Sequence, residues 1–86
     1  MGKYRVEIKK SAVKEIEHLP VKDMKAALDK IASLVDNPRP HDCQRLSGQE
    51  QYRLRRGNYR ILYSVEDDIL IVYIVKGGHR KDVYRG

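Results

Sequence analysis

Four arginines lie within eight residues of this chain, with no acidic residue among them. They are Arg53, Arg55, Arg56 and Arg60, and the dipeptide Gly57-Asn58 lies between the third and the fourth. A guanidinium group keeps its charge at physiological pH and donates forked hydrogen bonds, which match the oxygens of a phosphate. Nucleic acid is the polyanion that best suits such a row, so we expect recognition of RNA or DNA here.

The residues around Gly57-Asn58 predict a β-hairpin with a two-residue turn. Pairing across that turn places Arg56 opposite Tyr59, Arg55 opposite Arg60 and Leu54 opposite Ile61. Side chains alternate along a strand, so Arg53 shares one face with the facing arginines. The other face holds core candidates: Tyr52, Leu54, Tyr59, Ile61 and Tyr63. Two like charges directly across a hairpin are unfavourable, which favours a bound anion over a merely solvated surface.

The bulk composition supports an anionic partner and excludes several other classes of protein. The 86 residues predict one domain, residues 1–86, and 18 basic against 12 acidic residues give a net charge of +6. A single cysteine, Cys43, excludes an internal disulfide and a Cys-rich metal site, and we expect no metal and no cofactor. The longest apolar run, Ile69–Val75, is too short to span a membrane. With no signal peptide at its start, we expect a cytoplasmic protein.

Hydrophobic periodicity predicts an α+β fold that positions the arginines. It consists of an N-terminal strand, a helical hairpin, and a three-stranded antiparallel meander that completes one sheet, with the helices on one face. The expected elements are a strand at Lys3–Lys9, a helix capped by Ser11 and ended by Pro20, a helix from about Val21 to the break at Asn37-Pro38-Arg39-Pro40, a polar loop to about Gln51, and strands at 52–56, 59–65 and 69–75.

The face away from the helices is expected to form an open cleft. Pairing residues 63–72 across Asp67-Asp68 would set Leu62 opposite Tyr73 and Arg60 opposite Val75. The helices would cover the other face, which carries Leu54, Ile61, Tyr63, Val65, Leu70, Val72 and Ile74. A bend at Gly77-Gly78 would return the basic tail to the arginine face.

Five short motifs, in order along essentially the whole chain, resemble the RelE family of toxins within the RelE/ParE superfamily. They are Leu46-Ser47-Gly48, the strand Tyr52-Arg53-Leu54-Arg55, the segment Gly57 to Tyr63, an acidic turn, and the closing stretch from Gly78-His79-Arg80 to Val83-Tyr84. The resemblance implies a ribosome-dependent endoribonuclease that cuts mRNA in the ribosomal A site, without a metal.

Carried over by position, the family's catalytic set falls on Arg53, Arg55, Arg60, Arg80 and Tyr84. The strand's basic pair is arginine here, where the best-known family pattern has lysine, and arginine does not act as a base at neutral pH. We expect a phosphate clamp from Arg60 and Arg80, and proton transfer or base stacking by Tyr84. A packed tail aromatic is the alternative for Tyr84, and His79 is the second candidate for proton transfer.

Further RNA contacts are expected from Arg56, Lys76, His79 and Lys81. The resemblance also implies a cognate RelB-like antitoxin, with the toxin a monomer inside a hetero-oligomeric complex. Two other functions remain open: a gyrase poison of the ParE branch, and a nucleic-acid-binding module without chemistry.

Overall fold

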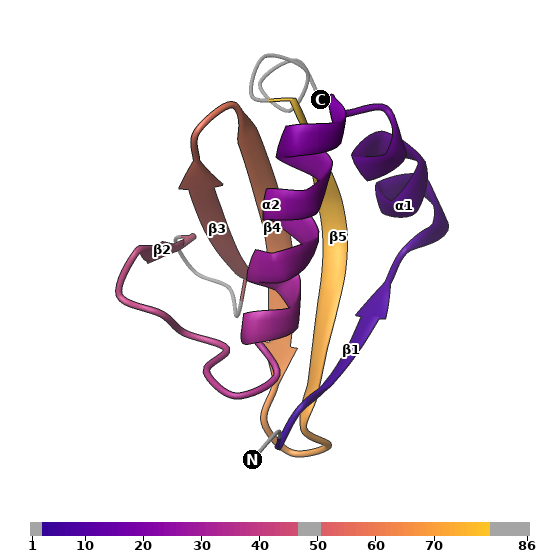
Figure 1. Ribbon diagram of the computed structural model, residues 1–86. Helices are drawn as coiled ribbons and strands as arrows, with labels where there is room; N and C mark the ends of the chain where they lie inside the picture. The colour runs from indigo at the N-terminus through magenta and orange to yellow at the C-terminus, as the bar shows by residue number, and fades with distance from the viewer. Residues whose placement is uncertain (1–2, 47–50, 80–86) are drawn as a thin grey trace.

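The computed structural model describes residues 3–46 and 51–79, which form one mixed sheet with two helices (Figure 1). The elements are β1 (Arg5–Ile8), α1 (Lys10–Glu17), α2 (Val21–Ser33), β2 (Cys43–Arg45), β3 (Gln51–Arg56), β4 (Tyr59–Glu66) and β5 (Ile71–His79). The strand order is β1-β5-β4-β3-β2. Strand β1 runs parallel to β5, and the other neighbours are antiparallel.

The expected α+β class, the N-terminal strand and the two helices are confirmed. The sheet, however, has five strands, because part of the expected polar loop forms the short edge strand β2. Cys43 pairs with Leu54 and Arg45 with Tyr52. A strand of three mostly polar residues carries too few side chains for an alternating pattern to show in the sequence.

Helix α1 begins two residues earlier than a cap at Ser11 predicts, and Ser11 is not its cap. Lys9 occupies the N-cap position and makes no side-chain capping hydrogen bond. Its amide instead donates to the carbonyl of Ile74 at 3.0 Å, which continues the ladder between β1 and β5. The strand pairing therefore sets where the chain turns into the helix.

The core lies between the helices and one face of the sheet. Ala12 and Ile16 of α1 and Ala27 and Ile31 of α2 are buried against the strands. All the expected sheet-core residues are buried except Leu70, which is 44% exposed; they are Tyr52, Leu54, Tyr59, Ile61, Tyr63, Val65, Val72 and Ile74. The hairpin register is also confirmed, including Arg55 opposite Arg60.

The expected pairing of β4 with β5 was wrong by three residues. The turn spans four residues, Asp67 to Leu70, because Glu66 pairs with Ile71, and this moves the register by two. Strand β5 then carries one extra residue, Val75, between the partners of Leu62 and Tyr63, which moves it by one more. Leu70 closes the turn at φ 55°, a left-handed conformation that a branched side chain adopts only at a cost.

The expected bend at Gly77-Gly78 was also wrong, because both glycines lie within β5. A Cβ atom at Gly77 would lie 3.0 Å from a side-chain carbon of Ile16, so the missing side chain lets α1 approach the strand closely. Strand β1 ends at Ile8, which pairs with Ile74 of β5. Past Ile74, helix α1 lies beside β5 in place of β1 (Figure 1).

A polar cluster at the end of the sheet that carries the β4–β5 turn joins this turn to the α2–β2 connection, to β3 and to the residue before β1. Arg39 donates two hydrogen bonds to the carboxylate of Asp67, at 3.1 and 2.7 Å, and a third to the Tyr52 hydroxyl at 2.7 Å. The Tyr4 hydroxyl donates to the same carboxylate at 2.7 Å. These bonds from Arg39, and then the one from Tyr4, hold the pKa of Asp67 below its ordinary value.

Within residues 3–46 and 51–79, no helix combines the length and the apolar character that crossing a bilayer requires.

Candidate functional site

The arginines occupy the sheet face opposite the helices, next to the turn between β3 and β4. Two neighbouring rows of cross-strand partners form this surface, which we call the cationic face. One row runs Gln44, Arg53, Leu62, Lys76, and the other runs Arg55, Arg60, Gly78. Neither row contains an aspartate or glutamate, so four cationic side chains lie on adjacent rows with no acidic residue between them.

The irregularity in β5 determines the side on which Lys76 lies. Strict alternation from buried Ile74 would direct Lys76 into the core. The extra residue Val75 reverses the alternation, so Lys76 pairs with Leu62 on the cationic face. Bulges of this kind often redirect a side chain beside a functional site. Lys76, an expected RNA contact, therefore lies on the cationic face, although the pairing of β5 with β4 was predicted wrongly.

Arg53 is oriented by a neighbour that the sequence analysis did not select. Its Nη2 donates a hydrogen bond of 2.6 Å to Oε1 of Gln44, the residue paired with it on β2. Arg53 is half-buried and Gln44 is exposed. The two residues are nine positions apart in the sequence, and the pairing of β2 with β3 brings them together. Because β2 was not predicted, the contact was missed.

The two facing arginines differ in burial. Arg55 is exposed, whereas Arg60 is 3% exposed and is the one buried charged residue in the described part of the chain. Arg60 was expected on an open face, and the described structure instead buries it. Arg60 lies on the central strand β4, flanked by β3 and β5. Burying a charged guanidinium costs desolvation free energy, and close packing around it limits its orientations. Such a fixed orientation suits a group that stabilises charge in a reaction.

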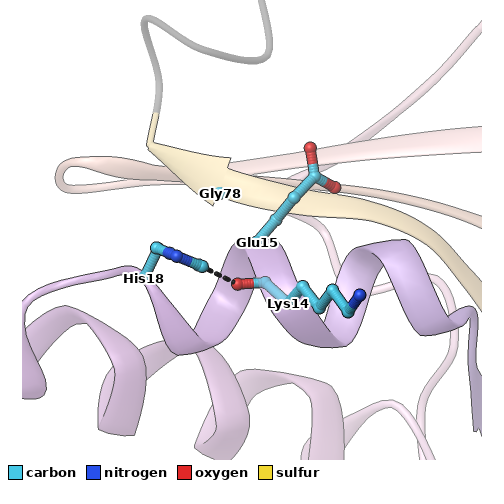
Figure 2. A pocket seen from close by; sticks show the side chains of 4 residues that line it. All are labelled: Lys14, Glu15, His18 and Gly78. Atoms are coloured by element: carbon cyan, nitrogen blue, oxygen red, sulfur yellow. Dashed lines mark hydrogen bonds between the residues drawn. The ribbon is translucent and has the colours of Figure 1, made fainter.

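Helix α1 closes the edge of β5 beside the cationic face. Figure 2 shows the Glu15 side chain reaching the end of β5, where its Oε1 lies 3.5 Å from the amide nitrogen of Gly77. His18 Nδ1 donates to the carbonyl of Lys14 at 2.6 Å. Among the described residues, Lys14, Glu15, His18 and Gly78 line a hollow of about 420 Å³ at this point. Only Gly78 of this lining belongs to the cationic face, so the hollow lies beside that surface.

The remaining expected site residues fall partly beyond the described structure. Arg80, Lys81 and Tyr84 lie outside the described residues, and so do the side chains of Arg56 and His79. The backbone places Arg56 opposite Tyr59, and Tyr59 opposite His79, at the end of the sheet that carries the cationic face. The structure thus brings together Arg53, Arg55, Arg60 and Lys76.

The cationic face has the chemistry of an anion site. Three guanidinium groups and one ammonium group supply donors and fixed charge for phosphate oxygens. Within the described part of the chain, no group of three His, Cys, Asp or Glu side chains is arranged to hold a metal ion. Leu62, half-buried between Arg53 and Lys76, adds an apolar surface in the middle of the four cations.

Comparison with known proteins identifies relatives over nearly the whole chain. A family model described as the ParE toxin of the type II toxin–antitoxin system parDE matches residues 6–84. A protein of Methanocaldococcus jannaschii named "Putative toxin RelE1" is 36% identical over 87 residues, which cover 96% of this chain and 97% of the relative.

Solved structures show the same fold. The archaeal RelE–RelB complex of Pyrococcus horikoshii contains a chain with 31% identity and a TM-score of 0.78, covering 91% of this chain and 96% of that one. The toxin–antitoxin complex RelBE2 of Mycobacterium tuberculosis contains a chain with 26% identity and a TM-score of 0.76, covering 90% and 98%.

Proposed function

The chain belongs to the RelE/ParE superfamily of toxins of type II toxin–antitoxin systems, and we propose that it is an endoribonuclease that cuts mRNA in the ribosomal A site. The single observation that carries the proposal is the cationic face, where Arg53, Arg55, Arg60 and Lys76 converge on one surface. RNA supplies the phosphates that such a surface binds. Cleavage of mRNA in the ribosome would stop translation and account for toxicity.

The proposed reaction is attack by a ribose 2′-hydroxyl on the neighbouring phosphorus. The O2′–P bond forms, the P–O5′ bond breaks, the hydroxyl proton passes to a base, and the departing 5′-oxygen gains a proton. Positioning and electrostatic stabilisation contribute most to such a step. In this proposal Arg60 and Arg80 hold the scissile phosphate, and Arg53 and Arg55 support them.

Arginine does not transfer protons at neutral pH, so the proton steps require another residue. We assign them to Tyr84, with His79 as the second choice. We expect Tyr84→Phe to keep RNA binding and lose most of the cleavage rate, and Tyr84→Ala to lose both, because the ring contributes to packing or stacking. Equal single-turnover rates for Tyr84→Phe and the parent would move the role to His79.

Primer extension on an mRNA in programmed ribosomes, with and without the protein, tests the function directly. New 3′ ends in the A-site codon are expected only when the protein is present. Because Arg60 is buried, its test variant is Arg60→Met, which fills most of the space of the lost side chain. Removing a catalytic phosphate donor costs about 10²–10³ in rate. If Arg60→Met folds and cleaves at the parent rate, the site assignment is wrong.

The second candidate is a gyrase poison, which the ParE description of the matching family model favours. The two functions differ in their first cellular effect. Protein synthesis stops rapidly after induction of an mRNA endonuclease, whereas DNA-damage signalling rises after induction of a gyrase poison. Pulse labelling of new protein beside a DNA-damage reporter separates them.

We also propose a RelB-like antitoxin as the partner, with the toxin as a monomer within the complex. The solved relatives from P. horikoshii and M. tuberculosis were crystallised as toxin–antitoxin complexes. The net charge of +6 and the cationic face fit an acidic or amphipathic partner. Hydrogen exchange on the toxin alone and in complex tests this. Increased protection of β3 amides would show that the partner covers the cationic face.

A further inference from the structure

Gln44 is the neutral member of a row whose other polar members are cations. It lies on β2, the edge strand, directly opposite Arg53 on β3. Its Oε1 accepts a 2.6 Å hydrogen bond from Arg53 Nη2. An arginine side chain has several rotatable bonds, and fixing it in one geometry without help costs rotamer entropy. An acceptor across the strand pair reduces that loss at the moment of binding.

The backbone of Gln44 is itself well anchored. The amide of the preceding residue, Cys43, donates to the carbonyl of Pro40 at 3.0 Å. Asp42 forms an ion pair of 3.1 Å with Lys30 of α2, and both side chains are at least three-quarters buried. Strand β2 is therefore tied to α2 as well as to β3, so the Gln44 side chain is presented from a fixed position.

The chemical type of the acceptor matters as much as its place. A carboxylate at this position would hold the guanidinium more strongly, but it would also cancel one positive charge of the cationic face. An amide oxygen orients the same guanidinium and leaves its charge intact. Gln44 thus meets both requirements of an anion site: a fixed donor geometry and undiminished charge.

We propose that Gln44 is a positioning residue that holds the Arg53 guanidinium in the orientation in which it contacts an RNA phosphate. The inference rests on the proposed function, which supplies RNA as the substrate, and it adds a further residue to the same site. Gln44 acts through Arg53 and does not itself touch the reacting atoms.

The decisive variant is Gln44→Met, which keeps the length of the side chain and removes the acceptor. The full-length protein is measured in single-turnover cleavage on programmed ribosomes. The expected result is a rate about 3- to 10-fold lower, the usual effect of losing one such hydrogen bond. The matched control is Gln51→Met, a glutamine of β3 on the same face in a row without arginine, which should cleave at the parent rate. Both variants should unfold within a few degrees of the parent, because surface changes rarely alter stability more.

A double-mutant cycle shows whether the effect passes through Arg53. Gln44→Met should add nothing to Arg53→Ala, because the oriented group is then absent. Gln44→Glu should unfold no earlier than the parent yet bind RNA more weakly, because its carboxylate keeps the hydrogen bond and neutralises charge. Parent-like cleavage by Gln44→Met, or equal losses by Gln44→Met with and without Arg53, would overturn the proposal.

A failure of the proposed function gives a different result. In that case the parent itself leaves ribosome-bound mRNA intact, whatever the variants do. Binding of a 2′-O-methyl RNA oligonucleotide, which resists this cleavage, then still tests Gln44. Gln44→Met must weaken that binding only when Arg53 is present, and an effect independent of Arg53 would again refute the positioning role.

Discussion

Replacing Arg55 by alanine should lower the salt dependence of RNA binding by a calculable amount. The cationic face offers four cations, Arg53, Arg55, Arg60 and Lys76, and each one that neutralises a phosphate of single-stranded RNA releases counterions. The slope of log affinity against log salt is about −0.7 per neutralised phosphate, so loss of the Arg55 contact should make the slope shallower by about 0.7. Arg55 is the best position to change because it is exposed, and its removal opens no cavity.

This difference in slope translates into a measurable difference in affinity. Between 50 and 200 mM salt the loss of affinity should be about 2.6-fold smaller for Arg55→Ala than for the parent. Fluorescence anisotropy with a 2′-O-methyl RNA measures both without cleavage. The control is Arg5→Ala, because Arg5 lies on β1, outside the two rows of the cationic face, and forms an ion pair with Glu7 at 3.2 Å. Equal slopes for the parent and Arg55→Ala would refute a phosphate contact by Arg55.

Two further predictions concern stability. Tyr63→Phe should lower the free energy of unfolding by about 1–2 kcal/mol, because the buried hydroxyl donates to the carbonyl of Pro38 at 2.9 Å; chemical denaturation measures this, and an unchanged midpoint would contradict it. Because the pKa of Asp67 is lowered in the fold, its bond to Arg39 stabilises the protein above the ordinary carboxyl pKa and is lost as the pH falls through the folded value. The difference in thermal stability between the parent and Arg39→Met should therefore be largest at pH 7 and should shrink as the pH falls below the ordinary carboxyl pKa, and a constant difference would exclude that linkage.

The parts of the fold that the sequence predicted are those set by local patterns. The turn at Gly57-Asn58 fixes the hairpin register, because Gly57 has φ +58° at the first turn position, which glycine adopts without strain. Alternating residues then determine which side chains of β3 and β4 enter the core. These two local signals are sufficient to place Arg53, Arg55 and Arg60 on one face.

The parts that were missed depend on contacts between distant segments. The turn at the end of β4 has no glycine to mark a two-residue loop, and four residues are used, with Leu70 in a left-handed conformation. No local sequence pattern predicts the irregularity at Val75, which places Lys76 on the cationic face. The parallel pairing of β1 with β5 and the edge strand β2 likewise have no signal within their own few residues, so Gln44 was overlooked.

Arg39 and the arginines of the cationic face have contrasting surroundings at the two ends of the sheet. At one end of the sheet Arg39 is held by Asp67 and Tyr52, and it joins the α2–β2 connection to the β4–β5 turn and to β3. At the other end the cationic face gathers like charges on neighbouring strands, an arrangement that opposes folding and is offset by the buried side chains beneath it. Because the core and the Arg39 cluster lie outside that surface, its exposed members are free to change with little effect on the fold. Buried Arg60 is the exception. A variant at this position must preserve the side-chain volume, because otherwise a loss of activity could result from a disturbed fold.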